Sequence, residues 1–503
     1  MEEGRDLRDE LVELDALLER LRLKRYDLIR KINRIHSPII RQLPPDVMST
    51  IFEFCLPNST NRQLWEISPY DKENNFSILS LGAICSYWRE IAWSTPSLWS
   101  SLVVCNPSEC DSHRVTGIAR DWLARSGRLP LSIRISSFSY NKTILALINI
   151  ISQYSTRWSD LVLYIPDSYY DYLAPENHAP ILISIQFHRN ITRKLNFRLT
   201  CPRLERASLG HFPLDGSNIQ WDNLTHLTLH FTSLIDFFII LRKTPRLVFC
   251  QISGYISLHR PEEQNISALV LTSLRSLHLM VDICSGVQDF LNNLTAPHLE
   301  EFSLQRKNRL SIGDVTSFFR RSACSLRSLS MTFKIFSYYF EGFMNILQSM
   351  PSLTTLSIQS VTSFEISNHP KEYDPRNISE LVVKILSSQS TSLKEGFLPN
   401  LRILEYTGEL YLRSGSYDDL YPLPPADNVA HGPFHLLKLE IHPANRIPEN
   451  MISYVSSLME RGITVNVLSD SKDILQSSID YYRSRKETLR RDWYDDLDLT
   501  FLS

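Results

Sequence analysis

The sequence predicts an α/β chain in three parts: a heptad-patterned helix at the N-terminus, a small helical module, and an irregular solenoid with parallel strands inside and helices outside. Three observations predict this fold. Apolar residues keep heptad spacing over residues 7–35, two short amphipathic patterns lie between residues 43 and 99, and a Leu-x-x-Leu-x-Leu segment recurs after residue 200. The 503 residues are enough for a long array of stacked repeats.

The first element is the helix expected over residues 1–36. Its apolar residues alternate steps of four and three, as in the seam of a coiled coil. They are Leu7, Leu11, Leu14, Leu18, Leu21, Leu28, Ile32 and Ile35, interrupted only at Arg25. Acidic residues come first and basic residues later, which complements the helix dipole. Two interpretations carry equal weight: the helix forms a homodimer or docks another helix, or it folds back on its own chain.

The second element is a helical module over residues 37–100, with a polar insert at residues 57–77. Its first helix is predicted to begin at Pro44 and Pro45, because proline suits a first turn whose N–H groups have no partner in the helix. Apolar residues at helical spacing follow, each set expected on one face of one helix: Val47, Ile51, Phe52 and Cys55, then Leu81, Ile84, Cys85, Trp88 and Ala92. Two helices this short cannot cover so much apolar surface, which indicates a partner site.

The residues of this module resemble the F-box, in the F-box-like variant of a large group of fungal proteins. The matching positions are Leu43-Pro44, Asp46, Val47, Ile51, Phe52, Cys85, Trp88-Arg89 and Pro96-Ser97-Leu98-Trp99, while the long insert departs from the family pattern. The resemblance implies a three-helix module that binds a Skp-type adaptor. It implies adaptor contacts at Leu43, Pro44, Pro45, Val47, Ile51, Phe52, Cys85 and Trp88. We expect Trp88 to be a core residue near that surface, and Trp99 to join the module to the segment that follows.

Residues 101–200 are predicted to be divergent first repeats. A helix is expected to end at Gly127, because glycine adopts the left-handed conformation that ends many helices. The strand LPLSIRI, a helix over residues 142–154 and the strand WSDLVLYI follow it. This alternation of helix and strand is typical of a parallel sheet with its helices on the outside.

Residues 201–471 are predicted to form the regular part of the solenoid. Segments such as TSLRSLHL and PHLEEFSL recur, mostly at steps of 20 to 27 residues, with a last step of 48. Their leading leucines are residues 204, 224, 247, 274, 299, 326, 353 and 401. The segments resemble leucine-rich repeats, although the Asn or Cys expected after the third apolar position is mostly missing. Residues 472–503 are predicted to be a capping helix and an acidic tail.

Residues that alternate with the core leucines of these strands are expected on the concave face, where a solenoid binds a protein partner. The substrate-contacting residues expected there are His226, Thr228, His230, Gln251, His278, Glu301, Gln305 and Gln359. An ordinary solvated sheet face is the alternative. A shared metal is not expected at His226 and His230, because residues four apart on a strand are roughly 13 Å apart.

Composition excludes several classes of function. The net charge of −2 provides no basic surface for nucleic acid, and no apolar run is long enough to span a membrane. The eight cysteines are scattered without metal-binding spacing, so we expect reduced, mostly buried thiols. Nucleotide-binding loops and hydrolase motifs are missing, and no cofactor or metal is expected. Because these motifs are missing, we do not expect an enzyme. The highly charged N-terminus does not resemble a signal peptide, so we expect a soluble cytoplasmic or nuclear protein.

The two resemblances together imply a substrate-recognition subunit of a Skp-cullin-F-box ubiquitin ligase. Its F-box would bind the Skp-type adaptor, and through it a cullin, while the solenoid would bind an unidentified protein substrate. The alternative is a ligase-independent leucine-rich-repeat scaffold, in which the heptad helix joins partners and the F-box only packs. An enzyme built on a repeat frame would need a polar pocket that the sequence does not indicate.

Overall fold

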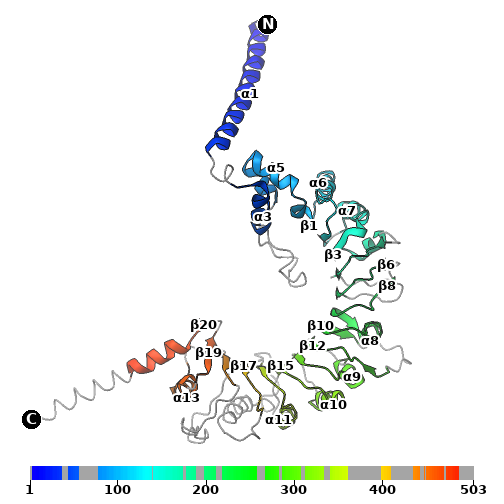
Figure 1. Ribbon diagram of the computed structural model, residues 1–503, viewed down its shortest axis with the longest axis vertical. Coiled ribbons are helices and arrows are strands. Elements are labelled where there is room, and N and C mark those ends of the chain that lie inside the picture. Colours follow the sequence, from blue (N-terminus) through cyan, green and yellow to red (C-terminus); the bar gives the residue numbers. More distant parts are fainter. Residues whose placement is uncertain are drawn as a thin grey trace, which may run out of the picture. The chain divides into compact units, whose positions relative to one another are not determined.

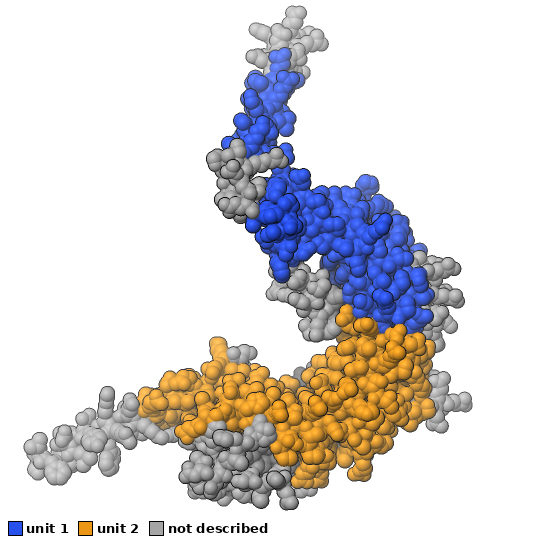
Figure 2. All heavy atoms as spheres, in the orientation of Figure 1, with its two compact units in different colours: residues 1–204, 215–220 blue, residues 205–214, 221–503 orange. Residues whose placement is uncertain are grey.

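The computed structural model of the chain describes the following residues (Figure 1): 3–36, 43–55, 78–138, 140–173, 177–187, 198–210, 218–257, 267–281, 286–306, 312–333, 340–360, 398–408, 434–441, 447, 449–460, 462–469 and 472–485. The insert expected at residues 57–77 and the acidic end of the chain lie outside them. The chain divides into two compact units, shown in different colours in Figure 2. The first comprises residues 1–204 and 215–220, and the second comprises residues 205–214 and 221–503.

The first unit begins with the helix α1 (Glu3–His36), which confirms the predicted N-terminal helix. Its residues are mostly Leu, Glu, Arg and Lys, which have high helix propensity. Two ion pairs lie along the helix: Arg22 Nη1 with Glu19 Oε2 at 3.5 Å, and Lys31 Nζ with Asp27 Oδ2 at 2.9 Å. The hydrogen bond and charge of Lys31 lower the pKa of Asp27. Residues 12–32 are exposed throughout, although Arg30 Nε donates to Ser86 Oγ of the following module at 3.1 Å.

The helical module follows as α3 (Pro45–Cys55), α4 (Ile78–Ile84), α5 (Ser86–Ser94) and the 3-10 helix η2 (Pro96–Trp99). These elements share one small core, whose buried residues are Met48, Phe52, Ile78, Leu81, Ile91, Ala92, Leu98 and Trp99. Polar contacts at its edge hold the helices together. Ser49 Oγ lies 2.9 Å from Thr95 Oγ1, and the Ser97 hydroxyl donates to Glu53.

The rest of the first unit alternates strands with helices, as predicted. Its main sheet is parallel, in the order β1 (Ser101–Cys105), β2 (Leu131–Ser136), β3 (Trp158–Tyr164) and β5 (Ser184–Phe187). Its helices are α6 (Ser112–Arg125), α7 (Lys142–Ser152), η3 (Ser155–Arg157) and η4 (Asp167–Tyr172). A smaller parallel sheet joins β4 (Asn177–His178), β6 (Arg198–Thr200) and β8 (Asn218–Ile219). Gly127, with φ of 60°, follows the end of α6 at the predicted position.

The second unit contains a sheet whose strands follow one another in sequence order. They are β7 (Arg206–Leu209), β9 (His226–Ser233), β10 (Phe249–Ser257), β12 (Ser276–Val281), β14 (Glu301–Arg306), β15 (Ser328–Phe333), β16 (Thr355–Ser360), β17 (Ile403–Gly408), β18 (Leu436–Ile441), β19 (Thr464–Ser469) and β20 (Lys472–Asp473). All described pairings are parallel except that of β19 with β20. Two further short strands, β11 (Leu269–Val270) and β13 (Leu294–Thr295), pair with each other.

The helices between these strands occupy one side of the sheet (Figure 1). They are α8 (Leu234–Arg242), α9 (Gly286–Asn293), α10 (Ile312–Ser322), α11 (Phe340–Gln348) and α13 (Glu449–Glu460). A last helix follows β20 and spans residues 475–485. Aromatic residues fill the layer between helices and strands. Phe290 of α9 lies 4.9 Å, between ring centroids, from Phe237 of α8, and Phe318 of α10 lies 5.8 Å from Phe302 of β14.

The repeated sequence segment corresponds to a repeated backbone turn. All eight leading leucines are buried, and in several turns the leucine N–H donates to the carbonyl three residues earlier, as Leu299 does to Ala296 at 3.3 Å. The residue before most of these strands then accepts two N–H groups from the start of the next repeat. Glu300 O accepts from Arg327 and Ser328 at 2.8 and 3.0 Å.

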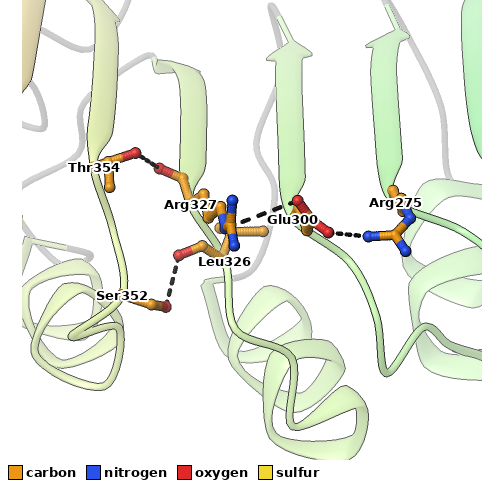
Figure 3. Close-up of polar contacts among 6 residues, drawn as sticks. All are labelled: Arg275, Glu300, Leu326, Arg327, Ser352 and Thr354. Carbon is orange, nitrogen blue, oxygen red and sulfur yellow. Dashed lines mark hydrogen bonds and ion pairs between the residues drawn. The ribbon is translucent and has the colours of Figure 1, made fainter.

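Side chains add further links between neighbouring repeats at the starts of these strands (Figure 3). Glu300 forms ion pairs with Arg275 and Arg327, while Thr354 Oγ1 donates to Arg327 O at 2.9 Å. Ser352 Oγ donates to Leu326 O at 2.8 Å. Because the same backbone contacts recur, neighbouring strands keep one register, and equivalent side chains from different segments lie in rows across the sheet.

Candidate protein-binding surfaces

Helix α3 has two apolar faces rather than the single face expected from the sequence. Met48 and Phe52 point into the module's core, and Phe52 is 0% exposed. Val47, Ile51 and Phe54 lie on the other face, where they are 41%, 40% and 79% exposed. We call these three residues the α3 stripe. Their spacing of four and three residues places them side by side on the helix, beside a core that is already closed without them.

The second half of the module is two helices, where the apolar spacing alone predicted one; with α3 they make the three helices that the F-box resemblance implies. Cys85 separates α4 from α5 because it is extended, with φ −156° and ψ 168°, and its Sγ accepts the N–H of Trp88 at 3.4 Å as the N-cap of α5. Arg89 Nε donates to Gly82 O at 2.8 Å, which joins the two helices across this break. On α4 itself, Leu81 is buried in the module's core whereas Ile84, the last residue of the helix, is exposed.

Trp99 connects the module to the first strand and helix of the following segment. The indole is 1% exposed, and its Nε1 donates to Ala92 O at 2.7 Å. Its ring meets Trp93 and Trp122 edge to face, with centroids 5.2 and 4.8 Å away. The Arg125 guanidinium lies 5.0 Å from the Trp99 ring centroid. Helix α6, which carries Trp122 and Arg125, is therefore part of the same packed cluster as the module.

The residues expected to contact the adaptor divide into three groups. Pro44, Pro45, Val47 and Ile51 are exposed. Leu43, Cys85 and Trp88 are partly buried, and Trp88 packs on Phe52 with ring centroids 5.0 Å apart. Phe52 is fully buried in the module's core, beneath the α3 stripe, whereas the other expected residues are at least partly exposed. Phe54 is not among the expected residues, although its spacing from Val47 and Ile51 places it on the α3 stripe.

Comparison with known protein families matches residues 40–105 to the F-box-like family. The matched stretch covers the three helices, η2 and β1, including the α3 stripe and Trp99. The chain therefore contains an F-box-like domain, and domains of this kind generally bind Skp-type adaptors. A search of curated proteins finds no match to the sequence.

A second candidate surface lies on the sheet of the second unit, on strands β9 to β16. Strand register aligns three rows of side chains that alternate with the buried residues. The first row contains His226, Phe249, Ser276 and Glu301, the second Thr228, Gln251, His278 and Ser303, and the third His230, Ser253, Met280, Gln305, Thr332 and Gln359. We call this surface the row face. It brings seven of the eight expected substrate-contacting residues onto four neighbouring strands, and Gln359 lies two strands further on.

Histidine and aromatic side chains pack together at one end of the row face. Phe249 lies between His226 and His278, with ring centroids 5.7 and 5.2 Å away. Alternation with the buried Cys250 places Phe249 on this face, although it is not among the expected substrate-contacting residues. Met280, which is also not among the expected contacts, is exposed, and its Sδ accepts a hydrogen bond from Gln251 Nε2 at 3.5 Å.

Hydroxyl groups contact the ring nitrogens of the row-face histidines: serines at His230 and His278, and Thr225 Oγ1, 2.9 Å from Nδ1, at His226. His230 contacts Ser253 Oγ through Nδ1 and lies 3.4 Å from Ser208 Oγ through Nε2. His278 Nε2 lies 2.8 Å from Ser276 Oγ, which donates to Glu301 Oε2 at 3.0 Å. The histidine side chains are thus held in place by neighbouring strands, which gives the row face a defined polar pattern.

Burial lowers the pKa of all three row-face histidines. It is the main cause for His226, His230 and His278, and the charge of Arg206 lowers the pKa of His226 further. Glu205 and Glu301 act in the opposite direction on His226 and His278. These side chains are consequently held neutral at physiological pH and can donate or accept hydrogen bonds without an added charge.

Other chemistry is limited in the described part of the chain. Within it, no three His, Cys, Asp or Glu side chains converge as a metal-binding group. None of the helices there combines the length and the hydropathy of a membrane span. The expectation of mostly buried cysteines is wrong for the described residues: Cys201 and Cys250 are buried, with pKa values raised to about 11 and about 12, but Cys55, Cys105 and Cys110 are exposed.

Proposed function

We propose that this chain is a non-catalytic substrate-recognition subunit of a Skp-cullin-F-box ubiquitin ligase. The F-box-like domain binds the Skp-type adaptor, and through it a cullin, while the row face binds a protein substrate. The subunit acts in the cytoplasm or nucleus. It contributes proximity rather than chemistry: tethering a substrate raises its effective concentration near the transferring subunits.

The α3 stripe is the observation that carries the adaptor proposal. Val47, Ile51 and Phe54 remain exposed although the module's own core is closed around Met48 and Phe52. Leu79 and Ile84 of α4 are also exposed, at 46% and 56%. Exposed apolar side chains at helical spacing are the anchors by which a helix binds an apolar groove. Covering them with an adaptor removes from water a surface that the isolated chain leaves wet.

The substrate proposal is supported by the composition of the row face. Phe249 and Met280 provide apolar contact area, while serine, glutamine and histidine side chains surround them with hydrogen-bonding groups. Apolar anchors inside a polar rim are typical of protein interfaces. We further propose that the repeated segments are irregular leucine-rich repeats stacked as a solenoid, since each buries its leucines only against its neighbours.

The adaptor proposal is tested with the full chain and a purified Skp-type adaptor. We expect Val47→Asp combined with Ile51→Asp to weaken binding more than about 100-fold, because two carboxylates would be desolvated in the contact. Ile118→Asp on α6 is the matched control, since Ile118 is an exposed apolar residue, at 43%, outside the α3 stripe. Unchanged far-UV circular dichroism would show that each variant is folded. Full-strength binding by the double variant would refute the proposal.

A ligase-independent scaffold is the second candidate, and the exposed apolar residues of α1 favour it. In that case the F-box-like domain would only pack against its neighbours, and no adaptor would co-purify with the intact chain. Co-purification of the adaptor with the wild-type chain, lost in the Val47 and Ile51 double variant, would exclude this alternative.

A further inference from the structure

Helix α1 carries an apolar stripe that the described part of the chain leaves uncovered. Leu14, Leu18, Leu21, Leu28 and Ile32 are each between 51% and 55% exposed. Their steps of four, three, seven and four place them on one side of the helix, which is about 50 Å long for its 34 residues. An isolated helix gains nothing from such a stripe, whereas a second helix against it would remove all five side chains from water.

The stripe's single interruption argues against a parallel, in-register pair. With Leu14, Leu21 and Leu28 at heptad position d, Arg25 falls at position a, between Leu21 and Leu28 in the seam. Two parallel copies in register would place Arg25 opposite its own equivalent, two like charges in one core layer. An antiparallel pair with Leu18 opposite Leu21 of the second copy instead places Arg25 opposite Leu14.

Charge along α1 favours the same antiparallel arrangement. Residues 3–19 contain seven acidic and two basic side chains, whereas residues 20–36 contain one acidic and seven basic side chains. Parallel copies would place like charge beside like charge over the whole length. Antiparallel copies place the acidic half of each helix beside the basic half of the other, which is favourable at distances within a Debye length.

Asp15 and Arg22 make this complementarity specific. Both fall at heptad position e, and in an antiparallel pair the e positions of the two helices face each other. In the register set by Leu18 and Leu21, Asp15 lies beside Arg22 of the second copy, and this contact occurs twice by symmetry. The long Arg25 side chain can also extend past Leu14 to bring its charge near Asp15.

We propose that α1 associates with α1 of a second copy as an antiparallel coiled coil, making the protein a homodimer. Leu14, Leu18, Leu21 and Leu28 form the seam, and the Asp15–Arg22 contacts fix its direction. The proposal does not depend on adaptor or substrate binding, because the residues that carry it all lie in α1.

The test measures self-association of the full chain by light scattering and sedimentation at low salt. The wild-type chain should reach the mass of two copies. Asp15→Arg alone and Arg22→Asp alone should each weaken association roughly 10- to 30-fold, because each converts two attractive contacts into repulsive ones. The double variant, Asp15→Arg with Arg22→Asp, should restore it. An equimolar mixture of the two single variants should also associate, since one copy then carries both arginines and the other both aspartates.

Several results would overturn the proposal. A wild-type chain that stays monomeric, or that reaches a mass other than two copies, contradicts the dimer. Association that is unchanged or strengthened by Asp15→Arg contradicts the antiparallel direction, because in a parallel pair residue 15 faces the acidic Glu10 and arginine there would help. Failure of the mixed single variants to associate contradicts the Asp15–Arg22 contact. Glu13→Arg, at an outward heptad position, is the matched charge control and should leave the mass of two copies unchanged.

Discussion

Replacing Trp99 by alanine tests whether the F-box-like domain and the segment after it fold as one unit. Trp99 lies on η2 and is almost completely buried. On one side it contacts Trp93 and the carbonyl of Ala92 in α5, and on the other it contacts Trp122 and Arg125 of α6. A smaller side chain would leave a cavity between these two helices and remove the partner of the Ala92 carbonyl.

The cost follows from these contacts. Truncating a buried tryptophan to alanine costs about 3–5 kcal/mol through lost burial and the cavity. The two edge-to-face pairs contribute about 0.5–1.5 kcal/mol each, and the Ala92 carbonyl loses a hydrogen bond worth about 1 kcal/mol. Because these terms overlap, we expect Trp99→Ala to lower the free energy of unfolding of the first unit by about 4–6 kcal/mol. Trp99→Phe, which keeps an aromatic ring there, should cost about 1–2 kcal/mol.

Urea unfolding of the full chain, followed by far-UV circular dichroism, measures these changes. If Trp99 connects the module to α6, both lose structure in the same transition, and hydrogen exchange should increase in α5 and in α6 together. Increased exchange confined to residues 78–99 would refute the reasoning, since the module would then unfold alone. A loss below about 2 kcal/mol for Trp99→Ala would show that the three-tryptophan cluster does not contribute as its geometry indicates.

Two further predictions concern single side chains. Gly82→Ala should destabilise the module by about 1–3 kcal/mol in urea unfolding, because a Cβ at Gly82 would overlap the Trp93 ring. Alanine has the higher helix propensity, so a variant that is more stable than the wild type would contradict this prediction. Burial lowers the pKa of His230 in the folded state. Below about pH 6.5 the unfolded state therefore binds a proton that the folded state does not, and the free energy of unfolding decreases as the pH is lowered. His230→Gln should reduce the loss of stability between about pH 7 and pH 5.5, and an unchanged loss would contradict the assignment.

Local sequence was sufficient to predict the elements whose pattern depends on near neighbours. Heptad spacing predicted α1, and the recurring leucines predicted strands whose inward residues are buried at every described repeat. Gly127 and the proline at the start of α3 marked element boundaries, because backbone conformation at glycine and proline is decided by the residue itself. The F-box-like motif was recognisable for the same reason, since its matching residues lie at fixed spacing.

Helical spacing alone assigned α3 one apolar face, although the helix has two. Met48 and Phe52 are buried because α4, α5 and η2 pack on that side, whereas Val47, Ile51 and Phe54 lie outside this core and remain exposed. A hydrophobic pattern shows which residues avoid water but not which element covers them. Apolar spacing also missed the break at Cys85, because a sulfur N-cap is a weaker signal than Ser, Thr, Asp or Asn, whereas the F-box resemblance implied three helices.

The sequence by itself determined which residues of this protein are apolar at regular spacing, and hence its helices, its repeated strands and its F-box-like motif. Tertiary structure alone decided which of those apolar residues remain exposed. It also decided which side chains from distant segments meet: parallel register placed Phe249 between His226 and His278 on the row face. The reason is physical: spacing along a chain sets local conformation, whereas burial and side-chain contacts depend on elements that are far away in sequence.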